Sequence, residues 1–409
     1  MIDDVSAVSA EDAARFRAGG YWQDGSVSEY LDRWADQLPD AAMVIDGDVV
    51  VTWTELRERA YRTAAALRRL GIGHGDRIVV QLPNWHEFAV LYLALARTGA
   101  VIVPAMPIYR ENELRHMIKM TEAKAIVVTS TFRGHDYLAM ARGLRAELPC
   151  VEQLVVVRPG DARLRPDELD AAAMGSGSGL PTDRDLGPHP SADDGHIIGF
   201  TSGTEAASKG CYHTWNTYSF SPRDQARIYH FGSTDRELVP SPITHTAGLA
   251  GGFLKPLIAG GSVCLMDAWN PSEALALIDR HRCTQATGAT AFIAGMVEAY
   301  DPEVHDAASL RYFICGGAPV PESTVAKVRD TLPNCKLIAC FGQTEGLMVT
   351  SCLPEDPDIK TSSTDGRALD GVELEVRDDD GNRLPPNEVG QIVYRSPGSM
   401  PGYWRNPAA

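Results

Sequence analysis

GFTSGTEAASKG, residues 199–210, is the stretch that decides the fold. A short apolar run, residues 196–198, precedes it and predicts a strand that leaves a core and turns sharply into a loop. Glycines let backbone N–H groups approach an anion closely, and hydroxyl side chains add hydrogen-bond donors. Lys209, near the end of the stretch, supplies a mobile positive charge for an outer phosphate. The stretch therefore predicts a phosphate-binding loop.

The order of residues in this loop differs from that of the usual P-loop, in which the lysine follows a glycine and precedes Ser or Thr. Here Lys209 precedes Gly210, and no hydroxyl residue follows the lysine. A surface loop rich in Gly, Ser and Thr has the same composition. Composition alone therefore leaves both interpretations open.

The string TSGTEAASKG resembles the signature phosphate loop of the adenylate-forming superfamily, which includes acyl- and aryl-CoA synthetases, peptide-synthetase adenylation domains and luciferases. The family form is close to TSGTTGxPKG, so this chain departs from it at residues 205, 206 and 208. The resemblance implies a set of residues around the ATP phosphates: Thr201, Ser202, Gly203, Thr204 and Lys209. It also implies that Lys209 takes part in catalysis.

A second signature follows a strand pattern at residues 336–340. Residues 341–346, FGQTEG, resemble the family's YGxTE segment. The resemblance implies that Phe341 offers a flat face to adenine, with Gly342 and Gln343 beside it. It implies that the Thr344 hydroxyl binds the α-phosphate. Glu345 offers the carboxylate oxygen that Mg²⁺ prefers together with substrate phosphates, so it is the expected metal ligand.

Small residues mark the expected substrate pocket. Gly316, Gly317 and Ala318 follow a strand pattern at 311–315, and ligands of open α/β sheets lie at the carboxyl ends of strands. The resemblance implies that this turn borders the adenine and the acyl group. It also implies a pocket formed by His245, Gly248, Gly288 and Met348. Since no Ser or Asp partner lies at a recognisable spacing from His245, we expect it to bind or position substrate rather than to join a triad.

The region before the loop predicts parallel sheet covered by helices. Strand patterns at 76–82, 101–104 and 125–129 alternate with helical patterns at 85–98 and 112–120. Residues 75–118 resemble the N-terminal part of acyl-CoA synthetases. The continuation to residue 149 resembles the cyclohexanecarboxylate–CoA ligase branch in particular.

Composition indicates a globular protein and excludes several classes. The chain has 409 residues, 44% hydrophobic content and a formal net charge of -16, which argues against non-specific nucleic-acid binding. No transmembrane span or signal peptide is visible. The eight cysteines form no C-x-x-C pair, which disfavours a zinc site and favours a reduced, cytoplasmic protein.

We expect an α/β fold with two helix-flanked, mostly parallel sheets and a small β-barrel. A Gly-, Ser- and Pro-rich connector at 161–190 suggests subdomains at 1–175, 190–345 and 346–409, all within one adenylation core. Residues 389–407 resemble the segment that closes the family's large core. The family's C-terminal lid domain, with its catalytic lysine, would follow. We therefore expect a truncated core with impaired activity.

The resemblance implies that the complete enzyme is an AMP-forming acid–thiol ligase. It would activate an alicyclic or medium-chain carboxylic acid with ATP and Mg²⁺ and pass the acyl group to CoA. An aryl- or aminoacyl-AMP ligase that loads a carrier protein, and a non-adenylating homologue that binds acyl-adenylate, stay open. An unrelated dinucleotide-binding module would need a GxGxxG fingerprint after the first strand, and none is present. The expected partners are the acid and the acceptor thiol, with a homodimer left open.

Overall fold

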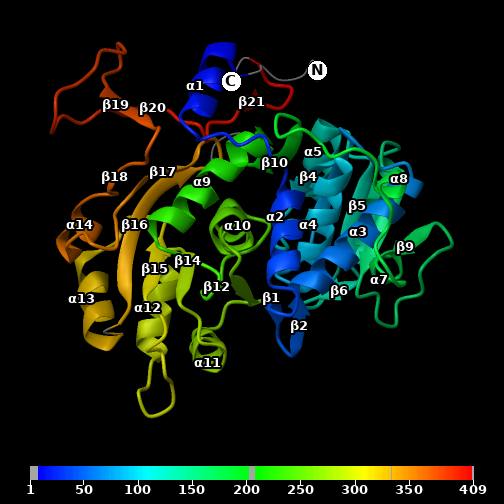
Figure 1. The fold of residues 1–409 in the computed structure, drawn as a ribbon, viewed down its shortest axis with the longest axis horizontal. Coiled ribbons are helices and arrows are strands. Elements are labelled where there is room, and N and C mark those ends of the chain that lie inside the picture. Colours follow the sequence, from blue (N-terminus) through cyan, green and yellow to red (C-terminus); the bar gives the residue numbers. More distant parts are fainter. Residues whose placement is uncertain (1–7, 202–207, 333, 408–409) are drawn as a thin grey trace.

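Two large sheets organise the computed structural model, which describes residues 8–201, 208–332 and 334–407 (Figure 1). The nine-stranded sheet has the order β18 (Arg367–Ala368), β17 (Leu347–Ser351), β16 (Lys336–Gln343), β15 (Tyr312–Cys315), β14 (Gln285–Gly288), β12 (Arg236–Val239), β13 (Ser262–Leu265), β1 (Ala42–Asp46) and β2 (Val49–Thr52). The eight-stranded sheet has the order β21 (Gly402–Tyr403), β11 (Gly210–Thr214), β10 (Gly195–Phe200), β4 (Val101–Pro104), β3 (Arg77–Gln81), β5 (Ala125–Thr129), β8 (Gln153–Val157) and β9 (Glu168–Asp170).

Both sheets are parallel in the middle; the nine-stranded sheet is antiparallel at both edges, and the eight-stranded sheet only at the edge formed by β11 and β21. The run from β16 to β1 in the first sheet and the run from β9 to β10 in the second pair in parallel. The edge strands β2, β17, β18, β11 and β21 pair antiparallel. The middle strands read as continuous buried runs, such as Val101–Pro104, because helices cover both of their faces. The predicted mostly parallel α/β architecture is confirmed.

Helices form three layers around the two sheets. The layer between the sheets consists of α2 (Val27–Gln37), α3 (Trp53–Arg69), α4 (His86–Thr98), α9 (Trp215–Ile228), the π-helical segment η1 (Ala247–Leu254) and α10 (Lys255–Ala259). The outer face of the nine-stranded sheet is covered by α11 (Pro271–His281), α12 (Thr290–Ala299) and α13 (Glu322–Thr331). The outer face of the eight-stranded sheet is covered by α5 (Glu111–Thr121) and α6 (Tyr137–Glu147).

The remaining elements are short and peripheral. They are α1 (Ala10–Ala18), α7 (Ala171–Met174), α8 (Asp183–Leu186), α14 (Asp358–Ser363), the hairpin β6 (Thr131–Phe132)–β7 (His135–Asp136) and the hairpin β19 (Glu373–Arg377)–β20 (Gln391–Arg395). The β19–β20 hairpin projects from the body of the molecule beyond β18 (Figure 1).

Helix α3 shows how local sequence builds the middle layer. Thr52 and Glu55 form a capping box, in which the Thr52 side chain accepts from the Glu55 N–H at 3.2 Å and Glu55 accepts from the Thr52 N–H at 3.0 Å. Ala60, Ala64 and Ala65 are buried along its inner face. These small side chains let α3 lie close to α4, so the two helices pack as one unit inside the core shared by both sheets.

The strands divide between the sheets across the boundaries expected from the sequence. β1 and β2, at 42–52, join the nine-stranded sheet through β13, although the strands that follow them belong to the other sheet. β10 and β11, which flank the phosphate loop, join the eight-stranded sheet through β4. Described residues 346–407 add strands to both sheets and one separate hairpin, and no barrel forms among them. Pairing between distant segments decides these assignments, and local periodicity does not report it.

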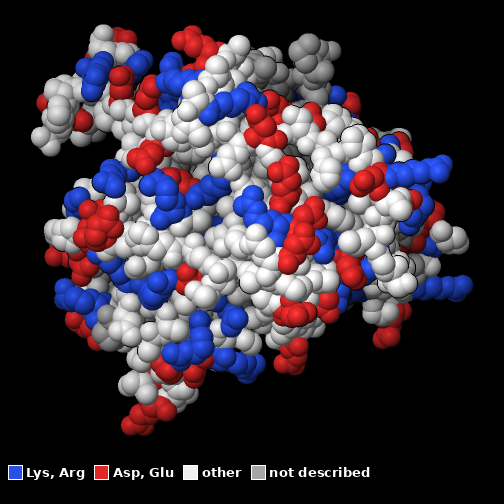
Figure 2. Space-filling model, viewed as in Figure 1, with Lys and Arg blue, Asp and Glu red and all other residues white. Residues whose placement is uncertain are grey.

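The surface mixes charges of both signs. Lysine and arginine alternate with aspartate and glutamate over the face drawn in Figure 2. In the described ranges, no helix combines the length and apolarity needed to cross a membrane. All eight cysteines are free thiols in the structure.

Candidate active site

A cavity of about 690 Å³ opens where the two sheets meet. Its walls come from the carboxyl ends of β14, β15 and β16, from α9 and η1, and from Thr201 at the end of β10. This volume is that of an ordinary small-molecule site. The cavity therefore lies at the strand-end crevice that the sequence predicted.

The two ends of the phosphate loop are tied to each other. The Thr201 N–H donates to the Lys209 carbonyl at 3.0 Å, and the Lys209 N–H donates to the Thr201 hydroxyl oxygen at 3.2 Å. The Ser208 hydroxyl also donates to the Thr201 carbonyl. The loop thus connects two antiparallel strands, whereas a P-loop leads into a helix. Ser202, Gly203 and Thr204, which were also predicted to bind phosphate, lie outside the described residues.

A tight turn between β16 and β17 carries the second signature. A Cβ at Gly342 would lie 2.1 Å from the Leu347 carbonyl oxygen, so only glycine allows this approach of the two strands. Gly346 closes the turn by donating its N–H to the Gln343 carbonyl at 3.2 Å. The close pairing projects Gln343, Thr344 and Glu345 from the sheet into the cavity wall.

Residues of the eight-stranded sheet hold this turn in place. His213 on β11 is hydrogen-bonded through Nε2 to the Thr344 carbonyl at 2.8 Å. Tyr403 on β21 donates its hydroxyl to Glu345 Oε1 at 2.7 Å. Lys209 Nζ lies 4.2 Å from the centre of the Tyr403 ring, a cation–π contact. The two signatures therefore meet at Tyr403, which contacts Lys209 of the first and Glu345 of the second.

His213 acts here as a neutral donor. Burial removes the water that would stabilise an imidazolium and lowers the pKa of His213 to about 4, although the bond to Thr344 opposes this shift. With Nε2 protonated, Nδ1 is free to face the Thr217 hydroxyl at 3.2 Å. The ring therefore fixes the backbone at Thr344 without adding a charge beside the phosphate region.

The predicted nucleotide-side residues divide into two groups. Gly316, Gly317, Gly342 and Gln343 line the cavity. Gly317 has a φ of 85°, a conformation that favours glycine. Ala318 is exposed beyond the turn, and Phe341 is half-buried in its strand opposite Thr350, so neither belongs to the cavity lining.

The predicted acyl-pocket residues also divide. His245, Gly288 and Met348 line the cavity, and Gly248 lies behind it in η1. A Cβ at Gly248 would meet the Pro242 carbonyl oxygen at 2.1 Å, so this glycine lets η1 pack against the preceding turn. His245 Nδ1 accepts the Ala247 N–H at 3.3 Å, which leaves Nε2 as the donor of the neutral ring. Although the side chain reaches the cavity surface, loss of surrounding water lowers the pKa of His245.

Several lining or supporting residues were not predicted from the sequence. They are Met106, Ser221, Gln225, Ser241, Gly251, Thr287, Phe292, His213 and Tyr403. Tyr403 lies within the predicted closing segment of the core, but its role there required knowing that β21 pairs with β11. Gln225 lies in the polar run SPRDQAR, so the sequence carries no signal that the fold would bury it.

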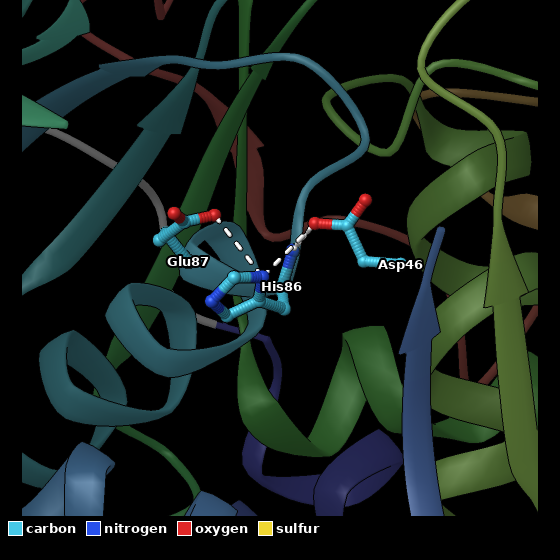
Figure 3. Close-up of side chains that lie close together, drawn as sticks. All are labelled: Asp46, His86 and Glu87. Atoms are coloured by element: carbon cyan, nitrogen blue, oxygen red, sulfur yellow. Dashed lines mark hydrogen bonds and ion pairs between the residues drawn. The ribbon is translucent and has the colours of Figure 1, made fainter. Parts of the chain in front are cut away.

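Asp46, His86 and Glu87 form the one group of potential metal ligands among the described residues (Figure 3), and none of the three lines this cavity. His86 Nδ1 lies 2.9 Å from Asp46 Oδ2 and 3.4 Å from Glu87 Oε2. Arg158 donates to Asp46 at 2.6 Å and to both oxygens of Glu87 at 2.7 and 2.9 Å. The guanidinium supplies the positive charge that balances these carboxylates, so the group is an ion-pair cluster rather than a metal site.

The cavity fits Mg²⁺ through a single carboxylate. Glu345 Oε2 has no hydrogen-bond partner in the described part of the chain, since Tyr403 bonds only to Oε1. Mg²⁺ is usually held by one or two carboxylates together with substrate phosphates and water. Glu345 supplies such a carboxylate, and it shares the cavity with Thr201, where the two ends of the phosphate loop are hydrogen-bonded to each other.

Comparison with known proteins agrees with this geometry. Residues 31–404 match the AMP-binding enzyme family. The medium-chain fatty-acid–CoA ligase of Escherichia coli (strain K12) is 31% identical over 398 residues, which are 96% of this chain and 69% of the relative. The salicyl-AMP ligase / salicyl-S-ArCP synthetase of Mycobacterium tuberculosis (strain ATCC 25618 / H37Rv) is 31% identical over 405 residues, 97% of this chain and 69% of the relative. The apo structure of Mycobacterium smegmatis MbtA superposes with a TM-score of 0.88 at 31% identity and covers 98% of this chain and 72% of that chain. By motif, fold and sequence, this chain belongs to the AMP-binding enzyme family.

Proposed function

We propose that this chain activates a carboxylic acid with ATP, giving an acyl-adenylate and pyrophosphate. One observation carries the proposal. The end of the phosphate loop at Thr201, Thr344 and Glu345 all line one cavity, and the same cavity continues into a pocket lined by small residues. The first group suits a nucleotide phosphate chain, and the second leaves room for an acyl group. Membership of the AMP-binding enzyme family supports the same reaction.

In the proposed step, a carboxylate oxygen of the acid attacks the α-phosphorus of ATP. The bond from that phosphorus to the bridging oxygen breaks, and pyrophosphate leaves. Thr344 donates its hydroxyl to the α-phosphate, while Thr201 and Lys209 hold the outer phosphates. Such chemistry depends mainly on positioning and on balancing charge. His213 and Tyr403 contribute by fixing Thr344 and Glu345.

Glu345 is the residue that would hold Mg²⁺ in this scheme. The cation, when bound, neutralises phosphate charge that builds up on the leaving pyrophosphate. The Lys209 side chain packs against the Tyr403 ring in the structure. In this scheme the side chain turns from the ring to the outer phosphates when ATP binds.

We propose a compact alicyclic or medium-chain acid as substrate and CoA as the acceptor of the second step. There, the thiol sulfur attacks the acyl carbonyl, AMP leaves, and the thiol proton passes to solvent. A carrier-protein thiol is the second candidate acceptor. The relative named a salicyl-S-ArCP synthetase is as similar to this chain as the fatty-acid–CoA ligase, so similarity favours neither.

The test is thermal stabilisation by non-hydrolysable acyl-adenylate mimics compared with AMP. A ligand that binds only the folded state raises the melting temperature of the protein. At one hundred times its Kd, the ligand adds about 2.7 kcal/mol to the free energy of unfolding. Cyclohexanecarbonyl and medium-chain mimics should stabilise the protein more than AMP does. Failure of every mimic and of AMP to stabilise the protein would refute the proposed function. A larger effect of an aryl or aminoacyl mimic would change the substrate class only.

A further inference from the structure

The deep wall of the cavity carries polar side chains that the proposed activation does not use. Ser221 and Gln225 lie one turn apart on α9, and Thr287 faces them from β14. The exposed fractions of their surfaces are only 0%, 5% and 8%. β14 ends at Gly288, and Thr287 precedes it, so Thr287 lies further into the sheet than the strand ends where the nucleotide would bind.

Gly251 of η1 lies between Gln225 and Thr287. A Cβ at this position would lie 2.8 Å from Thr287 Cγ2 and 3.2 Å from Gln225 Oε1. The glycine thus lets Thr287 and Gln225 pack closely against η1, and all three residues border the same cavity. A ligand atom can therefore reach the Gln225 amide from the cavity.

The neighbouring hydroxyl groups already have partners. Thr287 donates to Glu237 Oε1 at 2.7 Å, and Glu237 in turn pairs with Lys255 at 2.8 Å, both without solvent exposure. Thr287 therefore turns its methyl group toward Gly251. Ser221 Oγ accepts from Gln225 Nε2 at 3.0 Å and from the Met348 N–H at 3.3 Å.

One end of the Gln225 amide is left without a partner. Its nitrogen bonds to Ser221, while no donor among the described residues reaches Oε1. Oε1 is not fully enclosed by protein, so it is open to the cavity. A ligand that fills the cavity displaces water from Oε1 and must supply a partner, because an unpaired buried polar group is costly. The free end faces the cavity, so a group on the bound ligand is the natural partner.

We propose that the acid carries a hydroxyl group on the part of its skeleton farthest from the carboxylate, and that Gln225 binds this hydroxyl. The inference rests on the proposed function, which places the carboxylate near Thr344. A hydroxyl both donates and accepts, so it pairs with the amide whichever of its two ends faces the cavity. In the described part of the lining no lysine or arginine is present and Glu345 is the one acidic residue, so an ionised tail would find no counter-charge at the deep wall.

Selectivity follows from the same contact. A site that hydrogen-bonds a substrate hydroxyl rejects the analogue that lacks it, since the protein group is then left unpaired. Replacing Gln225 by leucine keeps similar volume and removes the unpaired amide. The variant should lose the preference for the hydroxyl and gain affinity for the hydrocarbon analogue.

The experiment measures the Kd of paired acyl-sulfamate adenylate mimics by calorimetry. One mimic carries cyclohexanecarbonyl, and the others carry its 3- and 4-hydroxy derivatives as separate cis and trans isomers. The proteins are the wild type, Gln225→Leu, and Gln153→Leu as a control on β8, away from the cavity. We expect one hydroxy isomer to bind the wild type at least about tenfold more tightly than the hydrocarbon mimic. Gln225→Leu should abolish that ratio, and Gln153→Leu should keep it.

Two results overturn the inference alone: a wild type that binds the hydrocarbon mimic as tightly as every hydroxy isomer, or a Gln225→Leu variant that keeps the hydroxyl preference. If neither AMP nor any mimic binds, the proposed function and the inference are both overturned. The wild-type panel decides the question even if Gln225→Leu does not fold.

Discussion

Glu345 is held by one oxygen only, and that arrangement makes its charge testable. Tyr403 bonds to Oε1, and a glutamine at 345 could accept the same bond while losing the negative charge. We expect Glu345→Gln to weaken ATP binding in the presence of Mg²⁺ by at least about tenfold, since even the outer partners of metal ligands are worth that much. Calorimetric titration with ATP, with Mg²⁺ and with a chelator, measures the effect. An equal loss in both conditions would show that the residue does not act through the metal.

Glu388→Gln is the matched control for this substitution. Glu388 is exposed on the segment before β20, and its substitution by glutamine changes the net charge by the same amount. Its variant should bind ATP as the wild type does under both conditions, because screened surface charges contribute little.

His213 ties the stability of the protein to pH. Burial lowers its pKa to about 4, whereas a histidine in an unfolded chain titrates near 6.5. Between these values the unfolded state binds more protons, so the free energy of unfolding falls as the pH falls. One such group accounts for about 1.4 kcal/mol per pH unit in that window. His196, whose pKa burial lowers to about 3, adds to the same trend.

We therefore expect His213→Gln to reduce the stability lost between about pH 6.5 and about pH 5 by roughly 2 kcal/mol. Urea unfolding at the two pH values measures the difference, and this difference is independent of any overall destabilisation. His189→Gln, at an exposed site, should keep the wild-type dependence. An unchanged dependence in His213→Gln would mean that the ring is already protonated in the folded protein.

At the scale of elements, the β16–β17 turn depends on a glycine. A Cβ at residue 342 would overlap the Leu347 carbonyl oxygen, which belongs to backbone and cannot move aside cheaply. Gly342→Ala should lower the free energy of unfolding by about 1–3 kcal/mol or more, the range for forced overpacking. Denaturant titration measures it.

Gly143→Ala provides the opposite expectation within the same protein. Gly143 lies inside α6, and an added Cβ there meets nothing within 4 Å. Alanine should stabilise that helix by about 0.5–1 kcal/mol. If both substitutions had the same effect, the close approach at Gly342 would not be the cause.

Local sequence predicted the elements better than their partners. The strand patterns at 101–104 and 125–129 correspond to β4 and β5. The sheet to which the β1–β2 hairpin belongs was not predictable, because β1 finds its partner β13 more than 200 residues later. Periodicity reports burial and not the partner that causes it.

The same limit explains which site residues were found. Thr201, Lys209, Thr344 and Glu345 lie in contiguous motifs whose chemistry is visible in the string itself. The supporting residues lie in other segments, and their importance comes from contacts that only the folded chain makes. They are His213, Tyr403 and Gln225.

At the scale of the whole molecule, an ion-pair cluster links the two sheets on the side away from the hairpin β19–β20. Asp46 ends β1 of the nine-stranded sheet, Arg158 follows β8 of the eight-stranded sheet, and Glu87 begins α4 between them (Figure 3 shows the acidic side of the cluster). Burial alone would raise the pKa of Asp46, but hydrogen bonds from His86 and the charge of Arg158 lower it overall. The carboxylate is therefore ionised and depends on the guanidinium.

Removing that guanidinium should loosen the contact between the sheets. Arg158→Leu leaves Asp46 and Glu87 without their shared partner, and hydrogen bonds to charged groups are worth about 1.5–3 kcal/mol each in net stability. Because the arginine is partly exposed, we expect a total loss of about 1–3 kcal/mol after screening. Arg115→Leu, which breaks an exposed pair with Glu147 between α5 and α6 of one outer layer, should cost no more than about 0.5 kcal/mol. Urea unfolding of both variants measures the contrast; equal losses would mean that the cluster contributes no more than an ordinary surface ion pair, and that the shared helical layer alone holds the sheets together.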